Sequence, residues 1–191
     1  MSFQHIVKIP HDRIGALIGS KGKVKLEIEK RCGVQVEIDG ETGDAVISDT
    51  GNAEKLELFK AIEVISAIAR GFSPQRAYRL FQGGDNPPIF IQIDLRSYAG
   101  KSSNNMERIK GRIIGEAGKS RRTIEELTGA SVSVYGHTVS LIGTYRETRI
   151  ASEAITMLSK GSMHKNVYKM LQNVRRKDKL DRMRLWEDSS G

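Results

Sequence analysis

Three features are scarce in this sequence, and each scarcity excludes a class of structure. Cys32 is the only cysteine among the 191 residues, so a disulfide within the chain and a cysteine zinc cluster are both excluded. The four histidines are scattered without ligand spacing, and we expect neither a metal site nor a cofactor. Aromatic residues make up 6% of the chain, which leaves few rings for a surface that would hold bases by stacking.

Long hydrophobic runs are also absent. No stretch reaches the roughly 18 uncharged apolar residues of a membrane span, and residues 1–10 carry a lysine and a histidine among their apolar residues, unlike a signal peptide. We therefore expect a soluble, cytoplasmic, monomeric protein without membrane contact.

Positive charge and apolar residues are both plentiful. The chain has 31 Lys and Arg against 23 Asp and Glu, which gives a formal net charge of +8 and a pI of about 9.6. This balance favours a polyanionic partner. Hydrophobic residues make up 38% of the chain, enough for a core, and its length corresponds to one large domain or two small ones.

One segment occurs twice. Residues 17–23 read LIGSKGK and residues 113–119 read IIGEAGK, so that Gly115 follows Gly19 by 96 residues. The register continues, because Gly33 aligns with Gly129 and Val36 with Val132. The chain therefore contains two copies of one unit.

Both copies predict the order β-α-α-β-β-α from the spacing of their apolar residues. The first copy has strands at residues 3–9, 34–38 and 45–48, a short helix from Pro10 to Gly19, and helices at 23–31 and 54–70. The second copy has strands at 89–95, 131–135 and 139–142, with helices at 106–114, 119–127 and 145–158. We expect an α+β fold of two tandem domains, each a three-stranded antiparallel sheet packed on three helices.

We place the domains at residues 1–72 and 89–160, joined by a helix and turn at 73–88. Ser73 is typical of a helix N-cap and Pro74 of a first helical position, so residues 75–82 are predicted to form one helix. The second copy has an extra segment at 96–105, either a loop that reaches toward a ligand or a tolerated surface insertion.

Residues 161–191 are predicted to form a helix at 163–171 followed by a basic tail. The tail carries six cations and four carboxylates: Arg175, Arg176, Lys177, Lys179, Arg182, Arg184, Asp178, Asp181, Glu187 and Asp188.

The repeated Gly-x-x-Gly has a specific physical use. Glycines lack Cβ atoms, so a sugar-phosphate backbone can lie against the turn, and the next helix presents free N–H groups and the positive end of its dipole. A lysine follows each second glycine. The candidate RNA-binding residues are those of both loops and the cations beside them: Gly19, Ser20, Lys21, Gly22, Lys23, Arg112, Gly115, Glu116, Ala117, Gly118, Lys119, Arg121 and Arg122.

Bases would then lie on an aliphatic floor beside each loop, predicted at Ile14, Ile18, Ile28, Val36, Ile114, Ile124 and Val132. The second loop has more cations around it, which predicts the stronger binding, although Glu116 opposes phosphate contact. The alternative for all these cations is a solvated helix face.

This arrangement resembles the KH domain in its type I form, whose loop clamps about four nucleotides of single strand. Residues 68–74 (IARGFSP), 93–96 (IDLR), 108–115 (RIKGRIIG) and 121–125 (RRTIE) resemble the KH pre-ribosomal RNA processing factors known as partner of Nob, and the related KRR-type proteins, in their archaeal form. The resemblance covers roughly residues 3–175.

The resemblance implies a role in assembling the small ribosomal subunit. Its members bind near the 3′ end of small-subunit rRNA and act with the Nob endonuclease and a dimethyladenosine transferase. Archaeal members are associated with the α subunit of initiation factor two. In eukaryotic members the first loop is degenerate, whereas here residues 19–22 are intact.

Other functions fit the sequence less well. A phosphate-binding P-loop ending at residues 118–120 would need glycine where Ile113 stands, and one ending at 100–102 would need it at Leu95. The glycines at 15, 19 and 22 have the wrong spacing for a dinucleotide fingerprint. Cys32 is interpreted as a small, half-buried residue in preference to a reactive thiol. A general mRNA-binding regulator and a protein scaffold remain alternatives, and no enzyme activity is expected.

Overall fold

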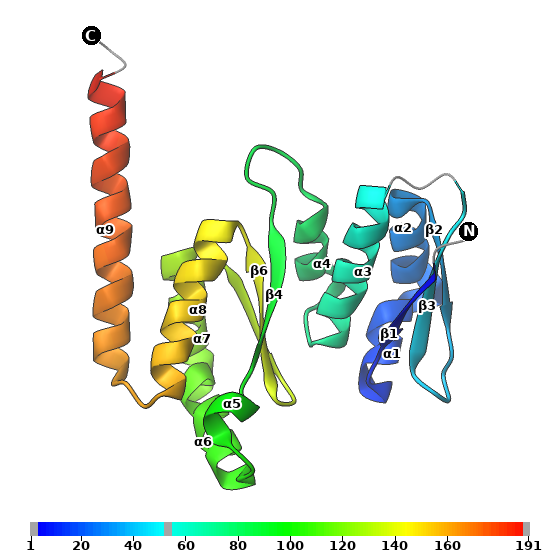
Figure 1. Ribbon diagram of the computed structural model, residues 1–191, viewed down its shortest axis with the longest axis horizontal. Helices are drawn as coiled ribbons and strands as arrows, with labels where there is room; N and C mark the ends of the chain where they lie inside the picture. The colour runs from blue at the N-terminus through cyan, green and yellow to red at the C-terminus, as the bar shows by residue number, and fades with distance from the viewer. Residues whose placement is uncertain (1–3, 52–54, 189–191) are drawn as a thin grey trace. The chain divides into compact units, whose positions relative to one another are not determined.

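The computed structural model of the chain describes residues 4–51 and 55–188, with side chains as far as Arg184. It divides into two compact units, unit 1 at Met1–Phe90 and unit 2 at Ile91–Gly191, which run from blue to green and from green to red in Figure 1. Phe3 and Glu54, the predicted first residues of a strand and a helix, lie outside the described residues.

Unit 1 confirms the predicted order of elements. Its sheet is antiparallel with strand order β1-β3-β2, in which Val7 lies opposite Ala45 and Val36 opposite Ile47. The elements are β1 (Gln4–Lys8), α1 (His11–Ile18), a 3-10 turn η1 (Ser20–Gly22), α2 (Lys23–Cys32), β2 (Val34–Ile38), β3 (Asp44–Asp49) and α3 (Lys55–Ala69).

The core of unit 1 lies between one face of this sheet and the three helices. Along β2, buried Val34 and Val36 alternate with exposed Gln35 and Glu37, which is the period of a strand with one buried face. The helices contribute fully buried side chains such as Leu17, Ile28 and Ile65. Burial of each such side chain contributes roughly 1.5–3 kcal/mol.

Unit 2 repeats this architecture with strand order β4-β6-β5 and Val132 opposite Leu141. Its core is built around Ile109, Ile124 and Ile155. The elements are β4 (Ile89–Asp94), α5 (Arg96–Ala99), α6 (Ser103–Ile114), a 3-10 turn η3 (Glu116–Gly118), α7 (Lys119–Thr128), β5 (Ser131–Tyr135), β6 (Thr138–Gly143), α8 (Tyr145–Ser159) and α9 (His164–Asp188).

The extra segment at 96–105, for which a ligand loop and a surface insertion were both left open, is helical at both ends, with α5 at its start and the first turn of α6 at its end. Asp94 accepts a hydrogen bond from the backbone N–H of Arg96 (2.9 Å), and the Arg96 guanidinium pairs with the same carboxylate (2.6 Å). These contacts start the short helix α5, and buried Leu95 and Ala99 anchor it in the core. The segment is therefore a built part of unit 2.

The C-terminal region also differs from the prediction, because the predicted helix and tail form one helix. α9 spans His164–Asp188, 25 residues, and includes all six tail cations. No glycine or proline interrupts residues 164–188, so nothing in the local sequence ends the helix at Leu171.

The segment between the repeats begins as predicted. The Ser73 hydroxyl caps α4 (Pro74–Ala77) by accepting from the Arg76 N–H, with Pro74 in the first turn. The helix then narrows into a 3-10 segment, η2 (Tyr78–Phe81). The Arg31 guanidinium lies 5.1 Å from the Phe81 ring centroid, which links η2 to α2. Among the described residues, no helix is both long enough and apolar enough to cross a membrane.

Candidate nucleic-acid interface

The two Gly-x-x-Gly loops have the same backbone conformation. The first glycines, Gly19 and Gly115, have φ/ψ of 71°/176° and 73°/172°. The second glycines, at 22 and 118, have 74°/10° and 75°/14°. Between them, Lys21 (55°/31°) and Ala117 (48°/29°) are the two non-glycine residues with positive φ among those that the structure describes. The sequence analysis did not predict this left-handed position.

The two glycines of each motif have different roles. The conformation of the first glycine is essentially restricted to glycine, and a Cβ at Gly115 would lie 2.7 Å from the backbone nitrogen of Ser120. A Cβ at Gly22 would meet no atom within 4 Å. The first glycine is therefore required by the turn itself, whereas the second leaves open space beside the loop.

The middle residues of both loops point into solvent. Ser20, Lys21, Glu116 and Ala117 are all exposed. The helices that follow, α2 and α7, begin at Lys23 and Lys119 with no side chain capping their first N–H groups. The Lys23 and Lys119 N–H groups donate to the carbonyls of Ser20 and Glu116 within the turns. Each loop therefore presents the positive end of a helix dipole and an exposed lysine to an anion.

Arg122 adds a further cation to the second loop. A Cβ at Gly118 would lie 3.3 Å from Nη1 of Arg122, so this guanidinium lies beside the second glycine. The aligned residue in unit 1 is Leu26, which is 59% exposed. The second loop therefore has a guanidinium where the first has an aliphatic side chain.

Arg112, one of the predicted RNA-binding residues, is held by two backbone carbonyls. Its Nε donates to the carbonyl of Leu158 (3.2 Å), and its Nη2 donates to the carbonyl of Ser162. In unit 1, Arg13 makes the same pair of bonds to the carbonyls of Ile68 (2.9 Å) and Phe72 (2.6 Å). Because the last carbonyls of a helix have no partner within it, each arginine caps the end of α3 or α8. The structure thus gives Arg112 a role in the fold.

This cap explains the Gly-Phe-Ser-Pro element at residues 71–74. The Phe72 N–H donates to the carbonyl of Ala67 (3.1 Å) across Gly71, which has a positive φ of 96°. Ser162 and Met157 make the matching bond in unit 2 (2.9 Å). Such a left-handed glycine turn ends a helix, and Ser73 then begins the next.

A carboxylate joins α2 or α7 to the edge strand in each unit. Oε1 of Glu125 accepts from the Val132 N–H (2.7 Å), and Oε1 of Glu29 accepts from the Val36 N–H (2.8 Å). β2 and β5 are edge strands, so their outward N–H groups have no strand partner. Arg121 lies 3.8 Å from the Glu125 carboxylate, beside β5. Arg121 is thus held at this edge, half-buried.

The predicted aliphatic floor is only partly available. Ile18 and Ile114 are 37% and 36% exposed beside their loops. Ile14 is half-buried. The other four predicted residues lie in the cores, because they occupy the inward faces of α2, β2, α7 and β5: Ile28, Val36, Ile124 and Val132. The floor prediction was wrong for these four.

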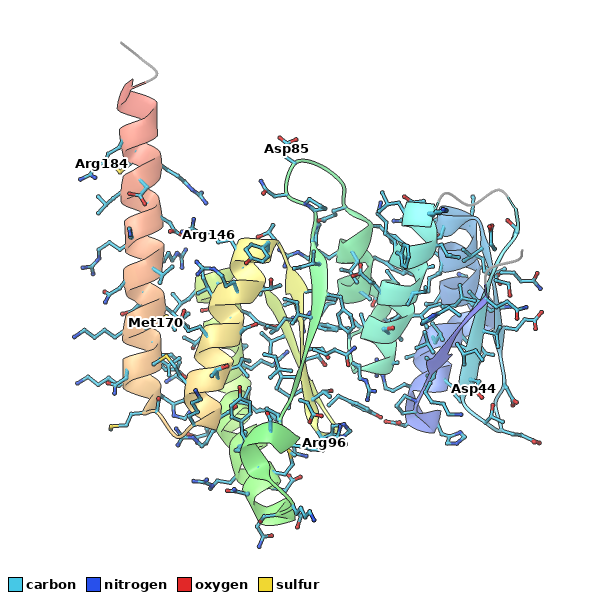
Figure 2. All side chains as sticks on the ribbon, viewed as in Figure 1. Asp44, Asp85, Arg96, Arg146, Met170 and Arg184 are labelled. Carbon is cyan, nitrogen blue, oxygen red and sulfur yellow. The ribbon has the colours of Figure 1, made fainter. Side chains whose placement is uncertain are left out.

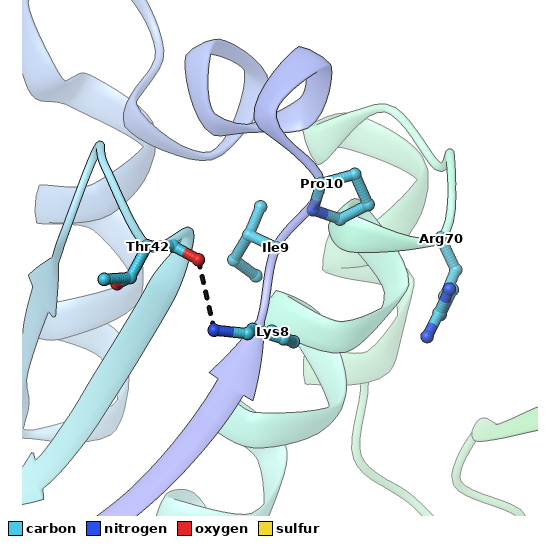
Figure 3. Close-up of a pocket in the computed structure, with 5 residues that line it drawn as sticks. All are labelled: Lys8, Ile9, Pro10, Thr42 and Arg70. Carbon is cyan, nitrogen blue, oxygen red and sulfur yellow. Dashed lines mark hydrogen bonds between the residues drawn. The ribbon is translucent and has the colours of Figure 1, made fainter.

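Two other features lie outside the interface. Cys32 is buried, and burial followed by the nearby Glu57 carboxylate raises the pKa of its thiol to about 11. It is a core residue rather than a reactive thiol. A pocket of about 300 Å³ in unit 1 is lined by Lys8, Ile9, Pro10, Thr42 and Arg70 (Figure 3). Lys8 donates to the Thr42 carbonyl there (3.1 Å). None of the pocket's lining residues belongs to a Gly-x-x-Gly loop.

Comparisons with known proteins match both units. Residues 4–66 match the KH domain, and residues 89–176 match the eukaryotic type KH domain (KH-domain type I) found as the second KH domain of PNO1. A KH domain-containing protein of Methanocaldococcus jannaschii is 44% identical over 97% of this chain and 80% of its own length. The pre-rRNA-processing protein pno1 of Aspergillus fumigatus is 32% identical over 66% of this chain and 48% of its own length.

A solved structure is similar along nearly the whole chain. It is the complex of aDim2p with a/eIF2alpha and rRNA from Pyrococcus horikoshii. The matching chain is 44% identical, with a TM-score of 0.85, over 92% of this chain and 96% of its own length.

Proposed function

The chain belongs to the PNO1/Dim2 family of KH-domain pre-rRNA-processing proteins, and from that premise we propose that its two Gly-x-x-Gly loops hold single-stranded rRNA of the small subunit, near its 3′ end, during ribosome assembly. The related Pyrococcus protein is in a complex with rRNA and a/eIF2alpha. We propose the corresponding factor, the α subunit of initiation factor two, as the protein partner of this chain.

The equivalence of the two loops carries the proposal. Their corresponding φ and ψ angles differ by at most 7°, although the two middle residues differ in chemistry. One conformation is thus kept while the side chains vary, as a contact made through the backbone requires. Phosphates would lie against the second glycine and the N-terminal ends of α2 and α7, with Lys23, Lys119 and Arg122 supplying charge.

Further partners and the setting of the protein are also proposed. The Nob endonuclease and a dimethyladenosine transferase are proposed to act on the same rRNA region while this protein holds it. We propose that the protein works in the cytoplasm and is itself a binding protein without catalytic activity. The chemistry of its loops supports the binding role, because a helix dipole and cations suit the holding of a phosphate.

The test is RNA preference. The protein is crosslinked in cell extract and the attached RNA is sequenced, and its affinity for a 3′-terminal small-subunit rRNA fragment is compared with that for an unrelated RNA of equal length. We expect recovery and tighter binding of the 3′ region. Equal affinity for both RNAs would favour the general mRNA regulator. Protein contacts without RNA affinity would favour a scaffold.

Salt dependence tests the backbone contacts. If each unit neutralises about three phosphates, the slope of log K against log salt is about −2 for one engaged unit and about −4 for two. Arg122→Leu, which copies Leu26 of unit 1, should weaken all single-stranded RNAs in similar proportion, because phosphate contacts position without specifying sequence. A slope near zero would contradict this binding mode.

A further inference from the structure

The helix α9 is docked on unit 2 along only part of its length. Val167 and Leu171 are buried and Val174 is half-buried, all on one face. Asp178 extends this face and pairs with Arg146 of α8. Beyond it, residues 179–184 are all exposed. Figure 2 shows the far end of α9, with Arg184, extending past α8.

Cations form a stripe on the opposite face of α9. The stripe consists of exposed residues spaced alternately by four and three positions: Lys165, Lys169, Gln172, Arg176 and Lys179. Residues at this spacing share one face of a helix. At 1.5 Å per residue the stripe is about 21 Å long. We call it the α9 stripe.

Carboxylates are placed away from the α9 stripe. Of the residues of α9 whose side chains are described, 164–184, only Asp178 and Asp181 are acidic. Asp178 lies on the docked face, and Asp181, three residues further, lies about 60° from it. No ion pair within the described residues involves the stripe cations. Its positive charge is therefore available to a partner.

The first residue of α9 contacts the helix that leads into the second loop. His164, the first residue of α9, donates from Nε2 to the carbonyl of Arg112 (2.8 Å), three residues before Gly115. Near the other end of the docked part, Arg175 reaches the carbonyl of Glu126 at the end of α7 (3.5 Å). α9 therefore runs alongside α7, from the approach to the loop toward the far end of unit 2.

We propose that the α9 stripe is a further RNA-binding surface, which contacts phosphates of the strand flanking the nucleotides held by the Gly-x-x-Gly loop of unit 2. The inference rests on the proposed function and extends it. The stripe charge complements a phosphate backbone, and the His164 contact places the start of α9 at Arg112, three residues before Gly115. Four of the five stripe residues are cations, which suits a phosphate backbone, and exposed apolar Leu180 and Met183 come only after its last residue, Lys179.

The test compares matched variants on RNAs of two lengths. The stripe variant, Lys169→Gln with Arg176→Gln, removes two charges from the α9 stripe. The control, Lys177→Gln with Arg184→Gln, removes two exposed charges from another face of the same helix. The two variants therefore have the same net charge as each other. Each is measured by fluorescence anisotropy on a short RNA of about four nucleotides, which fills one loop, and on RNAs extended by about eight nucleotides on the 5′ or the 3′ side.

We expect the parent to bind one extended RNA more tightly than the short RNA. The stripe variant should lose about tenfold on that extended RNA and less than twofold on the short one, and its salt slope should fall by about 1.4, from about 0.7 per contact. The control should still bind the extended RNA more tightly than the short RNA. Circular dichroism should show equal helix content in all three proteins.

The other outcomes separate this inference from the proposed function. If the stripe variant and the control lose equal affinity for the extended RNA, the effect comes from the overall charge of the protein, and the inference is overturned. So would short-RNA binding with no gain from either extension, although the loop proposal would stand. Failure of the parent to bind any of the RNAs would overturn the proposed function itself. Loss of binding to the α subunit of initiation factor two with RNA affinity intact would make the stripe a protein contact instead.

Discussion

The different roles of the two loop glycines can be separated by substituting each with alanine. At Gly118, alanine must adopt a left-handed conformation, which costs about 1–2 kcal/mol. Its Cβ would lie 3.3 Å from the end of the flexible Arg122 side chain, which can move. We expect Gly118→Ala to lower the free energy of unfolding by about 1 kcal/mol.

At Gly115 the same change is more costly. A φ of 73° with ψ of 172° is essentially closed to residues with a Cβ and costs up to about 3 kcal/mol. The new Cβ would also lie 2.7 Å from the backbone nitrogen of Ser120, so the start of α7 must shift. We expect Gly115→Ala to cost about 3 kcal/mol or more, at least about 2 kcal/mol beyond the change at Gly118.

The two variants are compared by thermal unfolding of the full chain, with hydrogen exchange measured on peptides of unit 2. At about 4–8 °C per kcal/mol for a domain of this size, Gly115→Ala should lower the melting temperature of unit 2 by more than about 12 °C. Exchange in unit 1 should change little, which serves as the internal control. Equal destabilisation by both variants would refute the assignment of different roles to the two glycines.

Three further predictions follow from the contacts described above. Arg112→Ala should destabilise unit 2 by about 1–3 kcal/mol in urea unfolding, because the carbonyls of Leu158 and Ser162 each lose the Arg112 guanidinium as a donor, and should leave the RNA affinity of the folded protein within twofold; a large loss of affinity with unchanged stability would return this residue to the RNA interface. Glu125→Ala should cost about 1–3 kcal/mol in the same assay, since the Val132 N–H loses its acceptor, whereas Glu125→Gln keeps an acceptor and should cost less; equal losses would contradict the role of this hydrogen bond. The hydrogen bond from the Arg96 side chain, followed by that from the Arg96 N–H, lowers the pKa of Asp94 to about 2, so the stability that this carboxylate adds is present above its ordinary pKa near 4 and is lost as the pH falls toward 2. Carboxyl NMR should show this midpoint, and Arg96→Ala should raise it; an unchanged midpoint would exclude the pairing in solution.

The repeated unit was predictable because independent local signals in the sequence specify the same elements. The alternation of Val34 and Val36, the helical spacing before Gly33 and the glycine stop all specify the same elements locally. Their boundaries in the structure differ from the predicted ones by a few residues at most, apart from the insertion and the C-terminal helix. Repetition at one register then makes chance coincidence of the motif improbable.

The features that the sequence analysis missed depend on tertiary contacts. Arg112 stands among cations before a glycine loop, and nothing local shows that its guanidinium reaches the end of a helix 46 residues away. A comparison of both repeats contained a signal, because Arg13 on α1 and Arg112 on α6 lie on corresponding helices, and their aligned positions are one turn apart. The aliphatic floor was overestimated because apolar residues at helix or strand spacing mark a buried face more readily than a ligand surface, as Ile124 and Val132 illustrate.

The measurement that tests the central claim most directly is RNA binding by loop variants that keep the fold. Ser20→Asp with Lys21→Asp places two carboxylates in the first loop, and Ala117→Asp places one beside Glu116 in the second. All three sites are exposed, and aspartate tolerates the left-handed conformation at 21 and 117. Each loop variant should melt close to the parent, within about 0.5 kcal/mol.

Anisotropy on a 3′-terminal small-subunit rRNA fragment then decides the role of the loops. The second-loop variant should weaken binding more than the first-loop variant, because Lys119 and Arg122 gather there. The combined variant should lose nearly all affinity, since two linked sites reinforce each other. Full affinity in the combined variant with an unchanged melt would contradict the account.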